Sequence, residues 1–334
     1  MPIAVPLKIT VQSSARLHMG FFDLHGGLGR KFGSIGLSLA APCIELSAIR
    51  ADSLSVTGLA SSRAEAIAEK FISELIRRNL NITSAVKLHI NQIILEHAGL
   101  GSGTQFALAI GTAINQLYGL NLTTEEIAEF TGRGNRSGIG IAAFNHGGLL
   151  IDGGRVSSID NATENKTKVP PLLARYDFPE DWRILLIIDQ NQPGIHGEQE
   201  LAAFKELPVF PEDLAAYLCR SVLMQAMPAI VEQDLTTFGK SIRELQMHVG
   251  DYFAPAQGGR YASKQVGAVL QYLESLGVAC YGQSSWGPTG FAVFESAEIA
   301  HKNLLKLKMA FTEPNLTWMI CSANNKGAEV VQAY

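Results

Sequence analysis

The first half of the chain alternates between two spacings of apolar residues. Apolar side chains at every second position indicate strands, because successive side chains of a strand point to opposite faces. Apolar side chains three or four positions apart, such as Ile67, Phe71 and Leu75, indicate helices. The predicted elements are strands at 7–11, 34–39 and 86–90, and helices at 62–78 and within 95–118. The apolar face of the second helix consists of Phe106, Ile110, Ala113 and Leu117.

The second half continues this alternation. The predicted helices are 213–232, 237–248 and 263–276, and the predicted strands are 184–188, 278–281, 290–294 and 316–321, with a further helix between the last two. Strands that alternate with helices in this way are typical of a mixed α+β architecture. We expect a split β-α-β arrangement in which helices cover a sheet.

Two predicted helix starts have the spacing of a capping box, in which a serine or threonine and a glutamate three residues later satisfy backbone N–H groups. Ser62 is followed by Glu65 at this spacing, and Thr123 is followed by Glu126. The first pair predicts the start of the helix at 62–78. The second predicts a short helix after Thr123.

A polar segment at 161–171 ends in two prolines and interrupts the periodic pattern. Such segments connect domains more often than they form helices or strands. We therefore predict an N-terminal domain at 1–170 and a C-terminal domain at 171–334.

Composition and charge narrow the class of protein. A chain of 334 residues with 47% hydrophobic and 17% charged residues can bury a large core, which excludes a disordered protein. The formal net charge is -4 and the basic residues are scattered, so nothing favours nucleic acid as a partner. The longest aliphatic run, 184–188, is too short to cross a membrane, and the first residues lack a signal-peptide pattern. Four widely spaced cysteines fit a reducing compartment, so we expect a cytoplasmic protein.

The most informative segment is the glycine-rich loop Gly99-Leu100-Gly101-Ser102-Gly103-Thr104 at the start of a predicted helix. Glycines let backbone N–H groups turn toward an anion, and the helix N-terminus adds partial positive charge. The loop therefore predicts a phosphate site. A tight turn that needs glycine only for its backbone conformation is the alternative. The spacing matches neither a Walker A loop nor a Rossmann fingerprint.

Three motifs resemble those of the GHMP kinases. The segment 96–104 resembles the second motif of that family, 14–20 resembles the first, and 282–290 resembles the third. The resemblance covers nearly the whole chain in the right order. It implies a ribosomal protein S5 domain 2-like N-terminal domain, a ferredoxin-like C-terminal domain, and an active site between them.

The sequence departs from the kinases of this family at one position. Many of them carry an aspartate in a Ser-Gly-x-Asp segment, where this chain has Ser137-Gly138-Ile139-Gly140. Gly140 supplies no carboxylate, and a positioned general base contributes roughly 10²- to 10⁴-fold in rate. The absence of this base argues against a kinase that depends on it.

The segments 15–24 and 29–37 resemble the β-ribofuranosylaminobenzene 5′-phosphate synthase branch of this superfamily. That resemblance implies transfer of phosphoribose from phosphoribosyl pyrophosphate to p-aminobenzoate or 4-hydroxybenzoate, with release of CO₂ and pyrophosphate. It implies Mg²⁺ as cofactor and a place in tetrahydromethanopterin biosynthesis. We expect a homodimer, the commonest assembly of soluble oligomers.

Three residues are the catalytic candidates. Asp23 is the sole acidic residue between Met1 and Leu39 and precedes several turn glycines, so we expect it to bind Mg²⁺ or a ribose hydroxyl. An ordinary turn aspartate is the alternative. Arg30 and Arg136 are expected to bind phosphate or carboxylate in a bidentate manner. A surface charge is the alternative for Arg30 and for the adjacent Lys31.

A larger set is expected to bind substrate or phosphate. Its members are Arg16, His18, Lys31, Gly99, Gly101, Ser102, Gly103, Thr104, Arg133, Ser284, Ser285 and Gly287. Arg16 and His18 lie two positions apart, so they share a face if the first predicted strand continues that far. A buried core histidine is the alternative for His18, and helix C-terminal capping is the alternative for Arg133. Trp286 is expected either to stack on an aromatic substrate or to belong to the core.

Three functions remain open on the sequence. Decarboxylating phosphoribosyl transfer is preferred. An ATP-dependent small-molecule kinase is the alternative suggested by the glycine loop, and a non-catalytic phosphate- or nucleotide-sensing protein is the third.

Overall fold

The computed structural model describes residues 7–80, 82, 86–134, 136–156, 169–192, 194 and 197–334, and excludes the side chains of 198–201. The connector predicted at 161–171 lies outside the described residues as far as 168.

Two long antiparallel strands form the centre of the first sheet, β1 (Lys8–Asp23) and β3 (Gly33–Arg50). The described part of the sheet has seven strands, in the order β13-β1-β3-β5-β4, with β6 paired to β3 and β8 paired to β6. Its other members are β4 (Ser55–Gly58), β5 (Val86–Gln92), β6 (Leu149–Asp152), β8 (Leu172–Tyr176) and β13 (Glu329–Ala333). Two short strands, β2 (Arg30–Lys31) and β7 (Arg155–Val156), pair separately.

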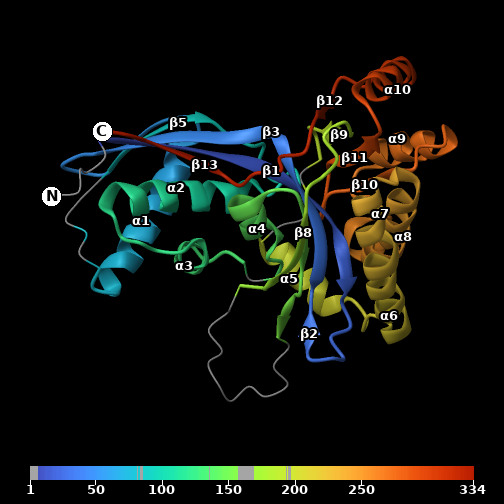
Figure 1. Cartoon of the computed structure of the whole chain (residues 1–334), viewed down its shortest axis with the longest axis horizontal. Coiled ribbons are helices and arrows are strands. Elements are labelled where there is room, and N and C mark those ends of the chain that lie inside the picture. The colour runs from blue at the N-terminus through green and yellow to red at the C-terminus, as the bar shows by residue number, and fades with distance from the viewer. Residues whose placement is uncertain are drawn as a thin grey trace.

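Four helices pack beside this sheet: α1 (Ser61–Arg77), α2 (Ser102–Tyr118), α3 (Thr124–Phe130) and α4 (Ile139–His146) (Figure 1). The capping box predicted at Thr123 and Glu126 is present at the start of α3. The box predicted at Ser62 is wrong. Helix α1 begins one residue earlier, after Ala60 in a left-handed conformation, and no side chain caps it.

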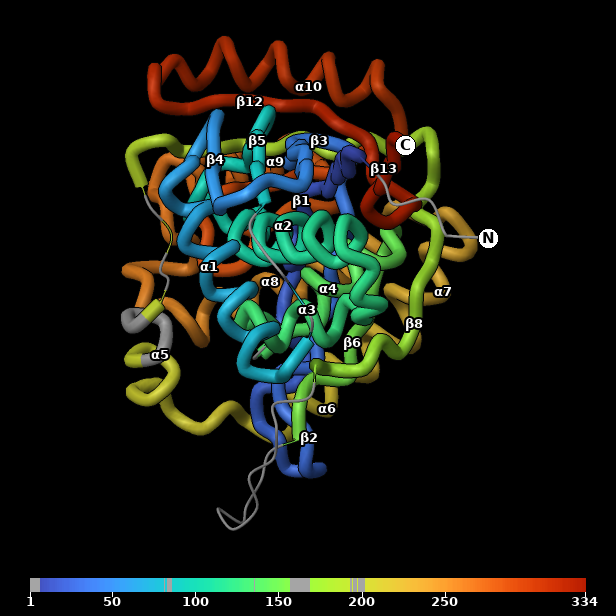
Figure 2. The backbone as a smooth tube through the Cα atoms, turned by 90° about the vertical axis from the view of Figure 1, so that its left-hand side faces the viewer, coloured from blue at the N-terminus to red at the C-terminus, as the bar shows by residue number. Residues whose placement is uncertain are grey.

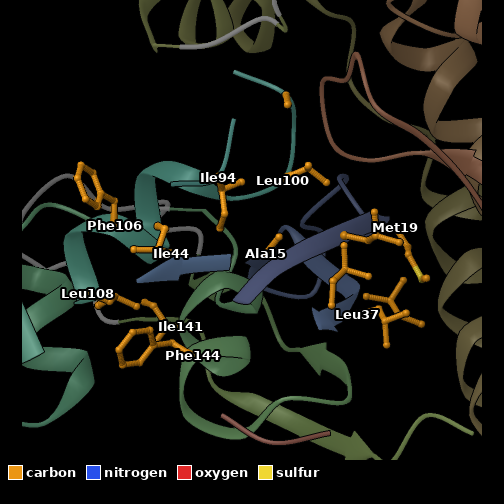
Figure 3. Close-up of a cluster of buried hydrophobic side chains, with 14 of the residues drawn as sticks. Ala15, Met19, Leu37, Ile44, Ile94, Leu100, Phe106, Leu108, Ile141 and Phe144 are labelled. Carbon is orange, nitrogen blue, oxygen red and sulfur yellow. The ribbon is translucent and has the colours of Figure 1, made fainter. Parts of the chain in front are cut away.

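The main hydrophobic core lies between the long strands and α2. The predicted apolar face of α2 is buried, and residues from β1, β3 and α4 pack in the same cluster. Figure 3 shows Ala15 and Leu37 of the strands together with Phe106 and Leu108 of α2 and Phe144 of α4. This core holds the start of α2, and hence the glycine loop, against β1.

The second sheet is antiparallel and has the order β10-β11-β9-β12. Its strands are β9 (Arg183–Asp189), β10 (Cys280–Gln283), β11 (Gly290–Phe294) and β12 (Leu316–Cys321). Leu185 and Ile187 of β9 pack in one cluster with α9 (Lys264–Ser275) and α10 (Ala297–Ala310). Ile184 and Leu186 instead join the main core with α8 (Leu235–Gln257). Figure 2 shows α10 and β12 together at one end of the molecule.

A helical run from α6 (Glu212–Ser221) through a π-helical turn (Val222–Ala226) to α7 (Met227–Glu232) covers the predicted helix at 213–232. By length and mean hydropathy alone this run could cross a membrane. Length and hydropathy are weak evidence for a membrane span, because core helices of soluble proteins have the same two properties. Here Leu218, Val222 and Ile230 are buried in the main core. The remaining helix, α5 (Gly197–Glu206), precedes this run.

The first sheet takes strands from both sides of the predicted boundary between 170 and 171. β8 follows that boundary and pairs with β6, and β13 comes from the end of the chain and pairs with β1. The division at this boundary therefore stays a prediction.

Candidate functional site

Two of the predicted motifs meet the glycine loop at one carbonyl group. The Nη1 of Arg16 donates a hydrogen bond of 2.6 Å to the carbonyl oxygen of Gly99. The Oγ of Ser284 donates a hydrogen bond of 2.7 Å to the same oxygen. The first and third motifs therefore hold the loop from two sides.

Strand β1 also contacts the late loop directly. The backbone N–H of His18 donates to Ser284 Oγ at 3.0 Å, and the N–H of Ser285 donates to the His18 carbonyl at 3.0 Å. A further bond of 3.0 Å joins the Arg16 N–H to the Leu100 carbonyl. The three motifs predicted from the sequence thus form one connected site.

The glycines of the loop are required by its conformation. Gly99 and Gly101 have φ of 77° and 81°, which disfavour residues with a Cβ. A Cβ on Gly99 would lie 2.3 Å from the Ser284 carbonyl oxygen, so only glycine allows the two loops to approach this closely. Gly101 is the N-cap of α2, and Ser102, Gly103 and Thr104 form its first turn. The loop therefore has the helix N-terminus that favours an anion.

Two arginines lie over this first turn. A Cβ on Gly103 would be 3.2 Å from Nη1 of Arg133 and 3.6 Å from Nη2 of Arg63. Burial, together with the nearby charge of Arg63, lowers the pKa of the Arg133 guanidinium. Sequence reasoning identified Arg133 but missed Arg63, which lies in a helix of otherwise ordinary amphipathic pattern.

Asp23 lies at the end of β1 and holds the turn that follows it. Its Oδ1 accepts hydrogen bonds from the backbone N–H groups of His25 (2.9 Å) and Gly26 (3.0 Å). Its Oδ2 makes no hydrogen bond with any residue that the structure describes. The turn-aspartate role is therefore present, and one oxygen remains for a ligand.

Arg30 is held by backbone carbonyl groups. Its Nε donates to Gly153 at 2.7 Å and its Nη2 donates to Gly154 at 2.6 Å. These bonds tie the β2 turn to the segment before β7, while the Nζ of the adjacent Lys31 lies 5.5 Å from the Phe32 ring. The side chains of Asp23 and Arg30 form these hydrogen bonds with the turn after β1 and with the segment before β7. None of these four bonds reaches the glycine loop.

A buried carboxylate missed by sequence reasoning organises the Arg136 segment. Asp152 accepts hydrogen bonds from Ser34 Oγ (2.6 Å), Ser137 Oγ (2.9 Å) and the backbone N–H groups of Gly138 and Gly154 (2.8 Å each). Burial raises the pKa of this carboxyl, against the opposing effect of these bonds. Arg136, next to this network, lies 5.2 Å over the ring of Phe204.

His18 is buried beside Arg16, as their shared face on the strand predicted. Burial, with a smaller effect from Arg16, lowers the pKa of His18 to about 3, so its imidazole is neutral at physiological pH. Its Nε2 has no hydrogen-bond partner among the described residues. A small cavity borders His18, Phe21, Phe253 and Trp286.

The late loop is built mainly from buried residues around a glycine turn. Ser284 is buried, and Gly287 has a φ of 65° and lies close to the side chain of Gln283. Trp286 is only 5% exposed, and its ring packs 4.3 Å from that of Phe253. Burial in the core therefore accounts for Trp286, and little of its ring faces solvent.

The described residues contain no group of three or more histidine, cysteine, aspartate or glutamate side chains that could enclose a metal ion. Magnesium is often held by one or two carboxylates together with substrate phosphates and water. The Oδ2 of Asp23 fits that limited demand.

Family models and solved structures identify the class of protein. The chain matches the GHMP kinases N terminal domain at 63–148 and the GHMP kinases C terminal model at 226–308. Homoserine kinase from Cytophaga hutchinsonii has a TM-score of 0.68 at 17% identity, covering 99% of each chain. Mevalonate diphosphate decarboxylase from Staphylococcus aureus has a TM-score of 0.66 at 13% identity, covering 97% of this chain and 98% of that one. The fold is that of the GHMP kinases.

Closer relatives define the branch. The chain is 36% identical to beta-ribofuranosylphenol 5′-phosphate synthase from Archaeoglobus fulgidus, covering 96% of this chain and 99% of that protein. It is 34% identical to the synthase of the same name from Methanocaldococcus jannaschii, covering 87% and 91%. The chain therefore belongs to the beta-ribofuranosylphenol 5′-phosphate synthase family, an enzyme branch of the GHMP kinase superfamily. The resemblance identified from the sequence motifs is confirmed.

Proposed function

We propose that this enzyme catalyses decarboxylating phosphoribosyl transfer from phosphoribosyl pyrophosphate to a 4-substituted benzoate, with 4-hydroxybenzoate or p-aminobenzoate as acceptor. The observation that carries the proposal is the 36% identity, over nearly all of both chains, to a synthase named for a ribofuranosylphenol phosphate. A phenol product follows from 4-hydroxybenzoate, and p-aminobenzoate would give the corresponding aminobenzene.

The chemistry needs no covalent intermediate with the enzyme. The para substituent pushes electrons toward the ring carbon that bears the carboxylate, and this carbon forms a bond with the anomeric carbon of ribose. The anomeric C–O bond breaks and pyrophosphate leaves with its electron pair. The C–CO₂ bond then breaks, CO₂ departs, and that electron pair restores the aromatic ring.

The site residues have distinct parts in this proposal. Negative charge grows on the leaving pyrophosphate, so cations and backbone N–H groups aimed at it stabilise the transition state. The glycine loop and the start of α2 supply N–H groups suited to a phosphate group of the donor, either the pyrophosphate or the 5′-phosphate. Arg136, placed over Phe204, is suited to a planar aromatic carboxylate.

Magnesium is part of the proposal. Asp23 would hold it through Oδ2, while Oδ1 keeps the turn in place. When bound, the ion neutralises charge on the pyrophosphate oxygens.

We further propose a cytoplasmic homodimer that acts in tetrahydromethanopterin biosynthesis. Light scattering at several protein concentrations tests the dimer.

Carboxylate-labelled acceptor tests the reaction. The protein is incubated with phosphoribosyl pyrophosphate, Mg²⁺ and either 4-hydroxybenzoate or p-aminobenzoate, and released CO₂ is counted beside a control without donor. Donor-dependent release supports the proposal, and the better acceptor identifies the substrate. No release from either acceptor contradicts it.

An ATP-dependent kinase is the second candidate, because the glycine loop and the fold are shared with kinases. Gly140 stands where many of these kinases carry a carboxylate, and a Cβ there would be 3.0 Å from Cγ2 of Thr104. Position 140 thus supplies no base and has little space for one. Phosphoryl transfer from ATP to an alcohol, with no CO₂ release, would favour the kinase.

A further inference from the structure

We infer that Arg63 of α1 and Arg133, which follows α3, form a clamp that binds one phosphate group of the phosphoribosyl donor over the first turn of α2. The identity of the donor rests on the proposed function. The clamp itself rests on the positions and partners of the two side chains.

Both guanidinium groups converge on one point. The Cβ position of Gly103 lies 3.2 Å from Nη1 of Arg133 and 3.6 Å from Nη2 of Arg63. Gly103 is the second residue of α2, where backbone N–H groups at the helix end attract anions. The two guanidinium groups and the N-terminus of α2 therefore bring positive charge to the space beside Gly103, which has no side chain.

The two arginines differ in how they are held. Arg63 forms an ion pair of 2.5 Å with Glu96, and its guanidinium lies 5.2 Å over the ring of Phe106. Both partners flank the glycine loop, Glu96 before it and Phe106 after it. Arg63 is thereby fixed to the loop although it belongs to another helix.

Arg133 has no such partner. Its guanidinium forms no hydrogen bond or ion pair with a residue that the structure describes, and its Nε is buried without an acceptor. Two like charges side by side repel each other, and a half-buried guanidinium without an acceptor is costly. An anion between the two groups would relieve both effects.

A phosphate group fits this arrangement better than a single carboxylate. It carries up to two negative charges and three free oxygens, enough to accept from two guanidinium groups and the helix N–H groups together. The donor has phosphate at two ends, the 5′-phosphate and the pyrophosphate. Inorganic pyrophosphate and ribose 5-phosphate represent these ends separately.

Calorimetric titration of the full chain with each of these two probes tests the clamp. Wild type is compared with Arg63→Met, Arg133→Met and the double variant, at constant ionic strength. Arg77→Met is the matched control, since Arg77 belongs to the same helix and also forms an ion pair, with Glu74 at 2.6 Å, away from the loop. Melting temperatures report whether each variant folds, and Arg133→Lys replaces Arg133→Met if the latter does not.

We expect each clamp variant to bind one probe roughly 10- to 100-fold more weakly, the usual effect of losing a charged hydrogen bond. The double variant should lose less than the product of the two single effects, because both arginines bind one group. The probe that is affected identifies which end of the donor the clamp holds. Arg77→Met should bind as wild type does.

Unchanged affinity for both probes in the folded clamp variants would overturn the inference. CO₂ release by wild type would then still support the proposed reaction. Conversely, weakened probe binding without any CO₂ release would leave the phosphate clamp in place and contradict only the reaction.

Discussion

At the scale of single residues, Asp23 combines two tasks that substitution can separate. One oxygen of its carboxylate accepts the N–H groups of His25 and Gly26, and the other is open to a ligand. An asparagine keeps an acceptor oxygen but loses the charge, whereas an alanine loses both.

Asp23→Asn should therefore reduce turnover by at least about 100-fold, as expected when a group that stabilises transition-state charge is lost. Its melting temperature should stay close to that of wild type, because the turn keeps its hydrogen bonds. Asp23→Ala should lower both the turnover and the melting temperature. The measurements are donor-dependent CO₂ release and thermal unfolding, and near-normal turnover of Asp23→Asn would exclude a metal or ribose role.

His18 makes the stability of the fold depend on pH. Its pKa is lowered from the ordinary 6.5 of a histidine to about 3 in the folded chain, so between these values the unfolded chain binds the proton more strongly. The contribution to stability is complete above pH 6.5 and decreases as the pH falls toward 3. From pH 7 to pH 5 this single residue should cost about 2 kcal/mol of unfolding free energy.

Urea unfolding of wild type and His18→Gln at pH 7 and pH 5 measures this effect. The variant lacks the titrating group, so it should lose about 2 kcal/mol less than wild type over the same interval. Equal losses in the two proteins would mean that His18 is not held neutral by burial.

At the scale of elements, helix α2 has a left-handed glycine near each end, and only one of them contacts another loop. Gly99 before the helix has a φ of 77° and faces the Ser284 carbonyl, while Gly119 after it has a φ of 62° and nothing within 4 Å of the position that an alanine Cβ would take. Alanine substitutions at Gly99 and Gly119 therefore separate the cost of the backbone conformation from the cost of the contact between the two loops.

Gly119→Ala should destabilise the protein by about 1 kcal/mol, the cost of placing a Cβ in the left-handed region. Gly99→Ala should cost about 3 kcal/mol or more, because its Cβ must also push the late loop away. Chemical unfolding measures both values. The same loss for both variants would show that the loops separate without cost.

At the scale of the whole molecule, the first sheet depends on both ends of the chain. Strands β8 and β13 come after residue 170 and pair with β6 and β1, respectively. The edge of β1 that pairs with β13 would be exposed in a shorter chain, and exposed strand edges promote aggregation.

A fragment of residues 1–170 should therefore lack a cooperative unfolding transition and should aggregate, while coexpression with 171–334 should restore a soluble complex. Thermal unfolding and size-exclusion chromatography of the fragment with and without its partner provide the measurements. A fragment that unfolds cooperatively as a soluble monomer would establish 1–170 as an independent domain.

Much of the fold and part of the site were predictable from the sequence, because both depend on local patterns. Periodic apolar residues located the long strands and helices, and glycines marked the segments at 99–104 and 282–290. The resemblance of the three motifs to those of the GHMP kinases implied that these loops belong to one active site. Elements of few residues, such as α4 and β13, have too short a pattern to be recognised alone.

Only the tertiary structure determined which charged side chains lie close together. Arg63 is one of several charges on an amphipathic helix, and Asp152 is the last residue of a short apolar strand without a recognisable motif. Packing of α1 and the end of α3 beside α2 brings Arg63 to Arg133. Pairing of β6 with β3 brings the buried Asp152 to Ser34, and Ser137 donates to the same carboxylate. The sequence determined local conformation, since that depends on neighbouring residues. The charge arrangement of the site depends on contacts between distant segments, which exist only in the folded chain.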